Sequence, residues 1–366
     1  MMRNSLKQRL ADDWRLISIL RAAQALCGLL FAFLLAEAAL RSFVPASPPL
    51  NASSLYYENH RGYYEQVALE GARPVYGIRY NSTREGFRLP DGPGGGSGRA
   101  AAGRGGILLL GDSFTYGRGV RYGDTCAARL EKLLSAEGAG APVFNAGVVG
   151  AGVEEVERAY LLLSRELKPR LVVYGLVLND FGARPPEGAA SDLIDGNNAA
   201  GRRGRFAHSR ALGLVSEILG RRSLTRRTLR AYRDSFTGPG AAEKFAAIAR
   251  LNSRVAADGG RLAVMVYPLL YELKEYPLYS AHEAVLSFCA AEDIPCLDLL
   301  PVFSRYGEER LQAAPSDQHP NELAQGVAAA ELAAFLRREG LIAAGAPARP
   351  LTAAYPEAPR QGYLIQ

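Results

Sequence analysis

Three residues of this 366-residue chain are of the types that carry out nucleophilic acyl chemistry: Ser113, His319 and Asp317. A serine hydroxyl becomes a nucleophile when a base takes its proton, and a third group orients that base. Ser113 follows the apolar run Ile107–Leu110 in the sequence Gly-Asp-Ser, and His319 stands in Asp-Gln-His-Pro-Asn, which begins at Asp317. We predict Ser113 as nucleophile, His319 as base and Asp317 as the orienting acid. From this stretch alone, the alternative interpretation is that Asp112 or Ser113 is a helix cap.

Acyl transfer also needs hydrogen-bond donors aimed at the oxyanion of the tetrahedral intermediate. The backbone N–H groups of Ser113 and Gly147 and the side-chain amide of Asn179 are the predicted donors. Gly147 and Asn179 each end a short apolar run. A side chain at position 147 is expected to obstruct the substrate.

Apolar runs and helical patterns alternate along the chain between these residues. Strands are predicted at Ile107–Leu110, Val143–Asn145, Leu171–Leu178, Arg261–Tyr267 and Pro295–Leu297. Helices are predicted at Asp124–Glu137, Gly152–Glu166, Ala241–Ala257, Leu278–Ala291 and Asn321–Arg338. This alternation predicts an α/β fold with a central, mostly parallel sheet covered on both faces. The candidate residues fall at strand-to-helix junctions, so we expect them to meet at the carboxyl edge of the sheet.

The segment Ala22–Leu40 is almost entirely apolar, interrupted only by Gln24 and Glu37. As a helix it is roughly 28 Å long, enough to cross a bilayer. Five basic residues precede it and only Arg41 follows within twenty residues. This asymmetry predicts a membrane anchor with a cytoplasmic N-terminus and the rest of the chain outside the cytoplasm, in the periplasm of a Gram-negative cell. A cleaved signal peptide remains an alternative, since residues 36–38 have the small-x-small form.

The net charge of +6 is unevenly distributed, because residues 201–235 hold ten arginines and only two acidic residues. This segment is either a solvated helical insertion or a cap that contacts anionic headgroups or an anionic substrate. Its location outside the cytoplasm argues against nucleic acid. The predicted organisation is a basic lead (1–21), an anchor (22–40), a linker with a strand-like part (41–106), a catalytic domain (107–340) with an insertion (183–240), and a flexible tail (341–366).

The four cysteines and four histidines do not have metal-ligand spacing, so we predict no structural metal. A disulfide between Cys289 and Cys296 is left open. The glycines that follow Gly147 do not match a dinucleotide-binding pattern, and no cofactor is predicted. The histidines at 60, 208 and 282 have no partner at catalytic spacing and are expected at the surface.

Together the Gly-Asp-Ser block, Gly147, Asn179 and the His-Pro-Asn block resemble the four blocks of the SGNH (GDSL) hydrolase superfamily. The similarity runs from about residue 76 to residue 338, and Tyr80–Arg88 resembles the YxxNxxGFR segment of membrane-anchored bacterial members. The resemblance implies a three-layer, flavodoxin-like sandwich and the roles given above. One departure is that the family acid commonly stands three residues before the histidine, where this chain has Ser316. A backbone carbonyl is therefore an alternative orienting group for His319.

The expected function is a membrane-anchored, extracytoplasmic serine esterase. It would remove acyl groups from a glycan or lipid through an acyl-enzyme. A polysaccharide O-acyltransferase that uses the same site is the first alternative. An inactive, anchored binding or scaffold protein is the second.

Overall fold

The computed structural model describes residues 2–43, 56–58, 64–66, 69–75, 78–82, 88–89, 105–136, 138, 140–182, 209, 211–212, 229–314 and 317–343. His60 and His208 lie outside these residues, as do most of the predicted insertion and most of the predicted linker. Of the predicted tail, residues 341–343 are described, and Leu341 and Ile342 pack partly buried against the core.

The centre of the fold is a five-stranded sheet in which every pair of neighbours is parallel. Its strands are β6 (Ile107–Gly111), β7 (Val143–Gly147), β8 (Leu171–Val177), β9 (Arg261–Tyr267) and β10 (Cys296–Asp298). Their order in the sheet is β7-β6-β8-β9-β10. Numbered by their occurrence in this sheet, that is the 2-1-3-4-5 order of flavodoxin-like folds. The predicted α/β class and flavodoxin-like topology are confirmed.

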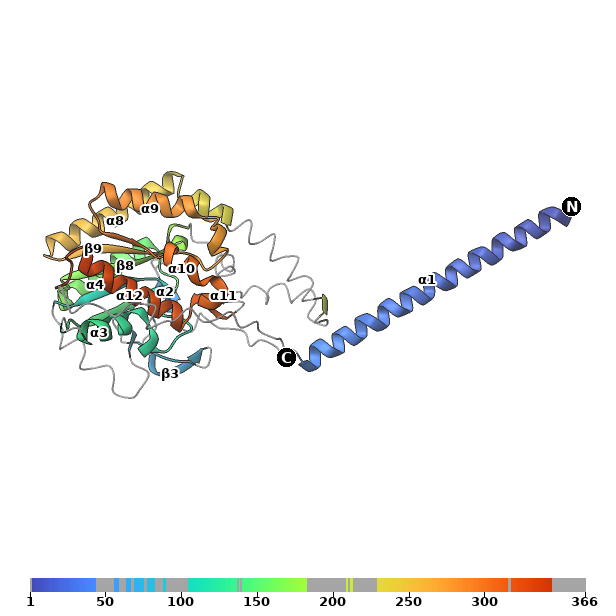
Figure 1. The fold of residues 1–366 in the computed structure, drawn as a ribbon, viewed down its shortest axis with the longest axis horizontal. Coiled ribbons are helices and arrows are strands. Elements are labelled where there is room, and N and C mark those ends of the chain that lie inside the picture. Colours follow the sequence, from blue (N-terminus) through green and yellow to red (C-terminus); the bar gives the residue numbers. More distant parts are fainter. Residues whose placement is uncertain are drawn as a thin grey trace. The chain divides into compact units, whose positions relative to one another are not determined.

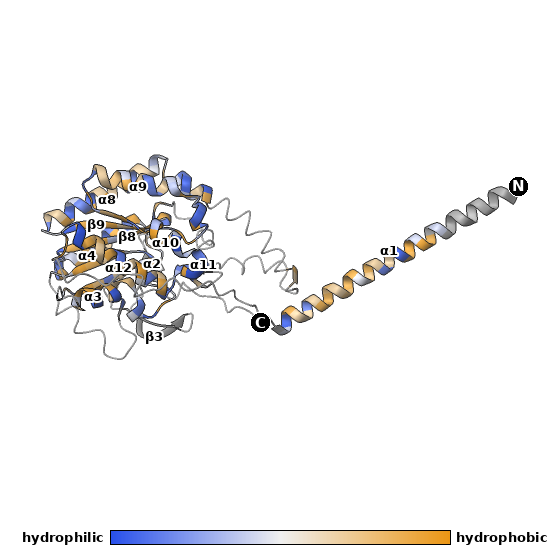
Figure 2. Cartoon of the chain, in the orientation of Figure 1, coloured by the Kyte–Doolittle hydropathy of each residue, from blue (hydrophilic) through white to orange (hydrophobic). Residues whose placement is uncertain are grey.

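Helices cover both faces of this sheet and make three layers (Figure 1). On one side α3 (Cys126–Ala136) packs against α12 (Glu322–Arg338). On the other, α4 (Val153–Leu167) packs against α8 (Pro239–Ala257), next to α9 (Tyr279–Ala291). All residues of β6, β7 and β8 are buried, and their apolar side chains make the centre of the domain the most hydrophobic part of it (Figure 2). This burial on both faces explains why the strands read as continuous apolar runs.

Short strands before the main sheet form two antiparallel sheets. One pairs β1 (Tyr56–Glu58) with β2 (Tyr64–Gln66). The other contains β3 (Leu69–Val75), β4 (Ile78–Ser82) and β5 (Arg88–Leu89). In the strand-like part of the predicted linker, β3 and β4 therefore pair antiparallel, with Val75 opposite Ile78, and β5 pairs antiparallel with β4.

A third small sheet comes just before the last helix in the chain. Here β11 (Gln312–Ala314) pairs antiparallel with β12 (Asp317–Pro320). Around the sheet edge stand the short helices α2 (Ser113–Tyr116), η2 (Tyr122–Asp124), η3 (Leu178–Phe181), η4 (Leu273–Glu275), α10 (Leu300–Tyr306) and α11 (Glu308–Leu311). His319 therefore belongs to this hairpin and not to a strand-to-helix junction of the main sheet.

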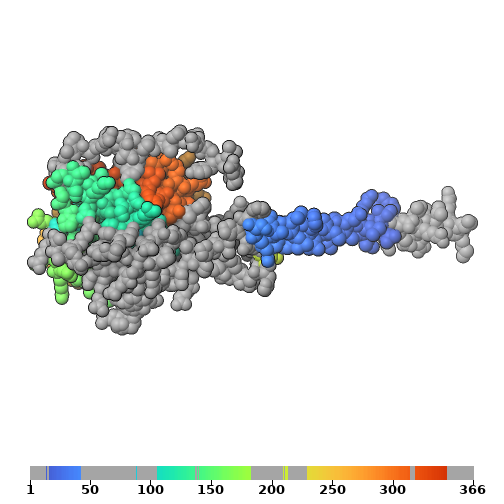
Figure 3. All heavy atoms as spheres, turned by 90° about the horizontal axis from the view of Figure 1, so that it is seen from below, coloured from blue at the N-terminus to red at the C-terminus, as the bar shows by residue number. Residues whose placement is uncertain are grey.

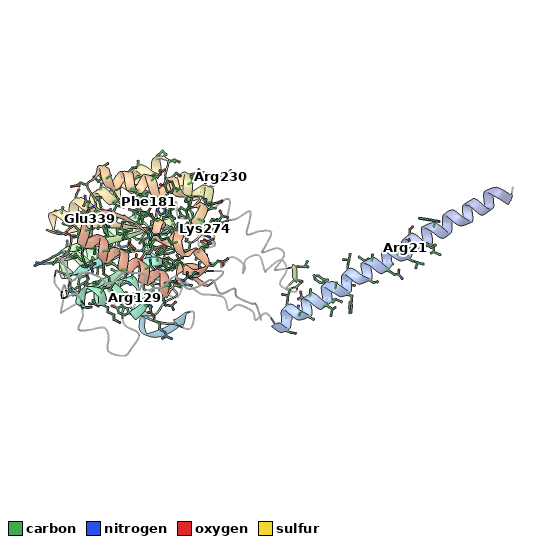
Figure 4. All side chains as sticks on the ribbon, in the orientation of Figure 1. Arg21, Arg129, Phe181, Arg230, Lys274 and Glu339 are labelled. Carbon is green, nitrogen blue, oxygen red and sulfur yellow. The ribbon has the colours of Figure 1, made fainter. Side chains whose placement is uncertain are left out.

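The N-terminal helix α1 (Met2–Phe43) contains a stretch, Leu16–Ser42, with a mean hydropathy of 2.0. Its length and composition suit a membrane span, and a signal sequence passes the same test. Arg21, labelled in Figure 4, lies within this helix. By its internal contacts the chain forms two units, one of Met1–Pro49 with Asn198–Leu224, and one of Leu50–Asn197 with Thr225–Gln366.

Within the first unit, Glu37 of α1 is the contact point for the segment around residue 210. Its Oε2 accepts hydrogen bonds from Ser209 Oγ at 3.0 Å and from the backbone N–H of Ala211 at 2.8 Å. Its Oε1 accepts one from Arg41 Nε at 2.8 Å. The Glu37 side chain is only 12% exposed. A carboxylate in the mostly apolar second half of α1 thus has at least one cation and two hydrogen-bond donors as partners.

Three residues of α9 and β10, His282, Cys289 and Cys296, were the subject of predictions from the sequence. His282 was expected at the surface but is completely buried in α9, and its Nδ1 lies 2.8 Å from Asp298 Oδ1 at the end of β10. Cys289 and Cys296 are free thiols in hydrogen-bond contact, and this bond together with burial raises the pKa of the Cys296 thiol. Near the opposite end of α9, Phe181 lies inside the domain (Figure 4) and stacks on Phe236 at 4.4 Å between ring centroids.

Candidate active site

Ser113 is the first residue of α2 and comes two residues after Gly111, the last residue of β6. The cap of this helix is Asp112, whose Oδ1 accepts the Phe114 N–H at 2.8 Å. Ser113 is therefore not the capping residue. Its hydroxyl lies 2.9 Å from His319 Nε2 and 3.4 Å from Asp112 Oδ2. A serine and a histidine that are 206 positions apart in the chain thus meet at hydrogen-bond distance.

His319 is held in place by its neighbours in the His-Pro-Asn block. Its ring is completely buried and packs against Phe114, with 5.4 Å between ring centroids. Asn321 caps α12 by accepting the Ala324 N–H at 3.0 Å. The amide of Asn321 also donates to the carbonyl oxygens of Arg310 and Gln312, at 2.8 and 3.0 Å. One asparagine therefore joins the last helix to the hairpin that carries the histidine.

Asp317 is the first residue of β12, two positions before His319. Its side chain lies outside the part of the chain that the structure describes. Its role as the orienting acid therefore stays a prediction.

Asn179 follows β8 in η3, and its Nδ2 donates to Asp112 Oδ2 at 3.3 Å. Burial raises the pKa of Asp112 to about 6, against the opposing effects of the Phe114 N–H, of His319, and of the Asn179 and Ser113 side chains. Next to Asn179, Asp180 accepts the Tyr174 hydroxyl at 2.7 Å and the Val177 N–H at 3.1 Å. Burial, followed by the nearby charge of Asp112, raises the pKa of Asp180. Asp112 and Asp180 both act as local hydrogen-bond acceptors in this site.

Gly147 ends β7 next to α2, and its surroundings give a different reason for a glycine than the expected one. A Cβ at this position would lie 2.3 Å from the backbone nitrogen of Tyr116, so a side chain would collide with α2 and not with a substrate. The N–H of Gly147 donates to Asn145 Oδ1 at 3.1 Å. This amide is therefore already engaged within the protein.

Gly150 lies in the turn between β7 and α4, where its φ is +82°. It is exposed, and its N–H has no hydrogen-bond acceptor among the residues that the structure describes. Gly150 is not among the donors predicted from the sequence, in which it was considered only as part of a dinucleotide-binding pattern. Its position after a strand and its left-handed conformation mark it as a second candidate oxyanion donor.

Two buried side-chain amides that were not predicted from the sequence donate hydrogen bonds to carbonyl oxygens of α2. Asn145 Nδ2 donates to the Thr115 carbonyl at 2.9 Å, and Gln325 Nε2 donates to the Phe114 carbonyl at 2.8 Å. Gln325 Oε1 also accepts the Cys126 N–H at 2.8 Å, which links α12 to the start of α3. The feature of the sequence that could have identified Asn145 and Gln325 is a polar residue in an otherwise apolar strand or helix face.

The segments that form the site are neighbours in space. On the face shown in Figure 3, the teal surface of the segment that begins at β6 adjoins the orange surface of the segment that precedes α12. Ser113 is 5% exposed. Among the described residues, no group of three or more His, Cys, Asp or Glu side chains could hold a metal ion.

A serine hydroxyl at hydrogen-bond distance from a histidine, placed at the carboxyl edge of a parallel sheet, is the arrangement found in serine hydrolases of the α/β class. The sequence model of the GDSL-like lipase/acylhydrolase family matches residues 109–327, which is more than half of the chain. The chain belongs to this family, and it is a hydrolase acting on ester bonds.

Several solved structures are similar to this chain at low identity. TesA is 18% identical, with a TM-score of 0.42 over 63% of this chain and 98% of its own. The esterase EstA from Pseudoalteromonas sp. is 16% identical, with a TM-score of 0.39 over 64% and 98%. The lipase/acylhydrolase from Enterococcus faecalis is 14% identical, with a TM-score of 0.39 over 65% and 97%. A search of curated proteins found no match.

Proposed function

We propose that this protein is a membrane-anchored serine esterase that acts outside the cytoplasm on acyl esters of a glycan or lipid, through an acyl-enzyme on Ser113. The observation that carries the proposal is the 2.9 Å distance between Ser113 Oγ and His319 Nε2. A neutral histidine at this distance accepts the hydroxyl proton as the oxygen attacks an ester carbonyl. The basic residues in the first half of α1 and the apolar stretch in its second half support the location.

In the proposed reaction, the Ser113 oxygen bonds to the ester carbonyl while His319 Nε2 takes the proton. The oxyanion is stabilised by the N–H of Ser113, by the N–H of Gly150 or Gly147, and by Asn179 Nδ2. Of the two glycines we favour Gly150, because the Gly147 N–H donates to Asn145. The alcohol leaves with the proton from His319, and water then releases the acid by the reverse sequence. Asp317 is the proposed orienting group for His319.

The test is hydrolysis of p-nitrophenyl acetate by the full chain in detergent, with Ser113→Ala and His319→Ala beside it. We expect kcat to fall on the order of 10⁴-fold or more in both variants, because the two residues act as one unit. Ser253→Ala is the matched control, since Ser253 is exposed on α8 and its hydroxyl donates to the Ala249 carbonyl of the same helix.

A fluorophosphonate probe read by intact mass separates the outcomes. Labelling of the wild type and of Ser253→Ala, with none in Ser113→Ala, supports the acyl-enzyme. Labelling with very slow turnover of the ester would point to a sugar acceptor in place of water, and glycan acceptors would then be supplied. A folded wild type that neither labels nor hydrolyses the ester would overturn the proposal.

A further inference from the structure

Arg88 is the last residue of the YxxNxxGFR-like segment, and it has no part in the chemistry described so far. It begins β5, outside residues 109–327 that the family model matches. Its side chain is nevertheless only 2% exposed. A buried arginine is uncommon unless its guanidinium is held by hydrogen bonds or charges.

The guanidinium of Arg88 binds the backbone directly after the proposed nucleophile. Its Nη1 donates to the carbonyl oxygens of Tyr116 at 2.9 Å and Gly117 at 2.5 Å, and its Nη2 donates to that of Val120 at 2.6 Å. The guanidinium carbon also lies 5.1 Å from the centroid of the Tyr116 ring. One side chain thus donates hydrogen bonds to three carbonyl oxygens that lie within seven residues of Ser113 in the chain.

These contacts matter because α2 has only four residues. A single helical turn is not stable by itself, and its last carbonyls have no partner inside the helix. Asn145 and Gln325 satisfy the carbonyls of Thr115 and Phe114, as described above. Arg88 donates hydrogen bonds to carbonyls at and after the C-terminal end of α2. A positive charge at this end also interacts favourably with the helix dipole. The position of Ser113 therefore depends on side chains that come from three other elements.

We propose that Arg88 is a positioning residue that holds α2 so that the Ser113 hydroxyl faces His319. This proposal rests on the proposed role of Ser113 as nucleophile. The strand β5, which precedes residues 109–327, is then part of the catalytic unit, because its Arg88 acts through the backbone at the end of α2.

The test compares Arg88→Ala and Arg88→Lys with the wild type in the full chain. For Arg88→Ala we expect kcat and the rate of fluorophosphonate labelling to fall about 100-fold, as for a displacement of roughly 1 Å at a reacting group. We expect KM to change only a few-fold, because Arg88 binds the backbone in and after α2 and is not proposed to contact the substrate. Arg88→Lys keeps the charge but loses the planar fork, so its kcat is expected between the two. Arg250→Ala is the control, since Arg250 is paired with Glu157 on the surface.

Guanidinium chloride at low millimolar concentration should restore the labelling rate of Arg88→Ala at least several-fold, at an unchanged Tm, whereas sodium chloride should not. A purely structural arginine would not give such rescue. If the wild type itself does not label, the proposed function fails. If the wild type labels and a folded Arg88→Ala labels equally fast, the Arg88 proposal is overturned. If Arg88→Ala does not fold, Arg88→Lys decides by the same comparison of rates, and a wild-type rate would overturn the proposal.

Discussion

Asp112 is a buried carboxyl one position before Ser113, and burial raises its pKa from 3.8 to about 6. Because the pKa of the folded state lies above that of the unfolded state, folding disfavours the ionised form. The stability that the protonated carboxyl contributes is fully present below about pH 3.8 and is lost as the pH rises through about 6. The ionised form in turn is the one that interacts favourably with a protonated His319.

Asp112→Asn removes this titration and keeps an oxygen that can accept the Phe114 N–H. We expect the free energy of unfolding of the wild type, relative to Asp112→Asn, to fall by about 1 kcal/mol between about pH 5 and about pH 7.5. Urea unfolding of both proteins at the two pH values measures this difference. An unchanged gap would mean that Asp112 has the same charge throughout the range.

At the scale of elements, the pair formed by His282 and Asp298 joins α9 to the end of β10. Asp298 Oδ1 also accepts the Leu300 N–H at 2.9 Å, at the start of α10. The Tyr276 ring lies edge-on to the His282 ring, 5.2 Å between centroids. The buried imidazole of His282 thus contacts both Asp298, at the end of β10, and the ring of Tyr276.

Replacing His282 with alanine removes the partner of Asp298 and leaves a cavity beside Tyr276. We expect His282→Ala to lower the free energy of unfolding by about 2–5 kcal/mol. Glu283→Ala, at an exposed position of the same helix, should change it by less than about 0.5 kcal/mol. Urea unfolding measures both, and equal effects would contradict a structural role for the pair.

The helices and strands differ in how well the sequence alone predicts them. The main strands were predictable because continuous apolar runs lie between helical patterns, and Ser113 was predictable from its place after one such run. The hairpin that carries His319 was not, because β11 and β12 have only three and four residues and neither contains an apolar run. The roles of Arg88, Asn145 and Gln325 were missed because their partners are backbone carbonyls in and directly after α2, and a sequence does not show which carbonyls a polar side chain will reach. His282 was placed at the surface because its partner, Asp298, becomes visible only once α9 packs beside β10.

At the scale of the whole molecule, only the first part of the arginine-rich segment groups with the N-terminal helix by its contacts. The unit that contains α1 includes Asn198–Leu224, and Ser209 and Ala211 bind Glu37. If α1 spans a bilayer, Glu37 is close to one end of the span, and Ser209 and Ala211 are tied to that end. Anionic headgroups attract such basic segments, with about 1 kcal/mol for each residue close to the surface.

We expect the combined change of Arg221, Arg222, Arg226 and Arg227 to glutamine to raise KM at least about tenfold for an ester presented in anionic mixed micelles. KM for the same ester in neutral micelles should not change. These four arginines lie outside the described residues, so the prediction rests on their charge in the sequence. The matched control replaces Arg250 and Arg254 of α8 with glutamine. Equal effects in both micelles would contradict an electrostatic role.

The contact at Glu37 also bears on proteolytic processing. The residues Ala36, Glu37 and Ala38 have the form of a signal-peptidase site, and cleavage after them would remove the carboxylate that Ser209 and Ala211 bind. A released form of this enzyme would therefore differ from the tethered form in more than its location. It would carry an arginine-rich segment without its partner, so processing at this site would change the surface charge that the enzyme presents as well as set it free.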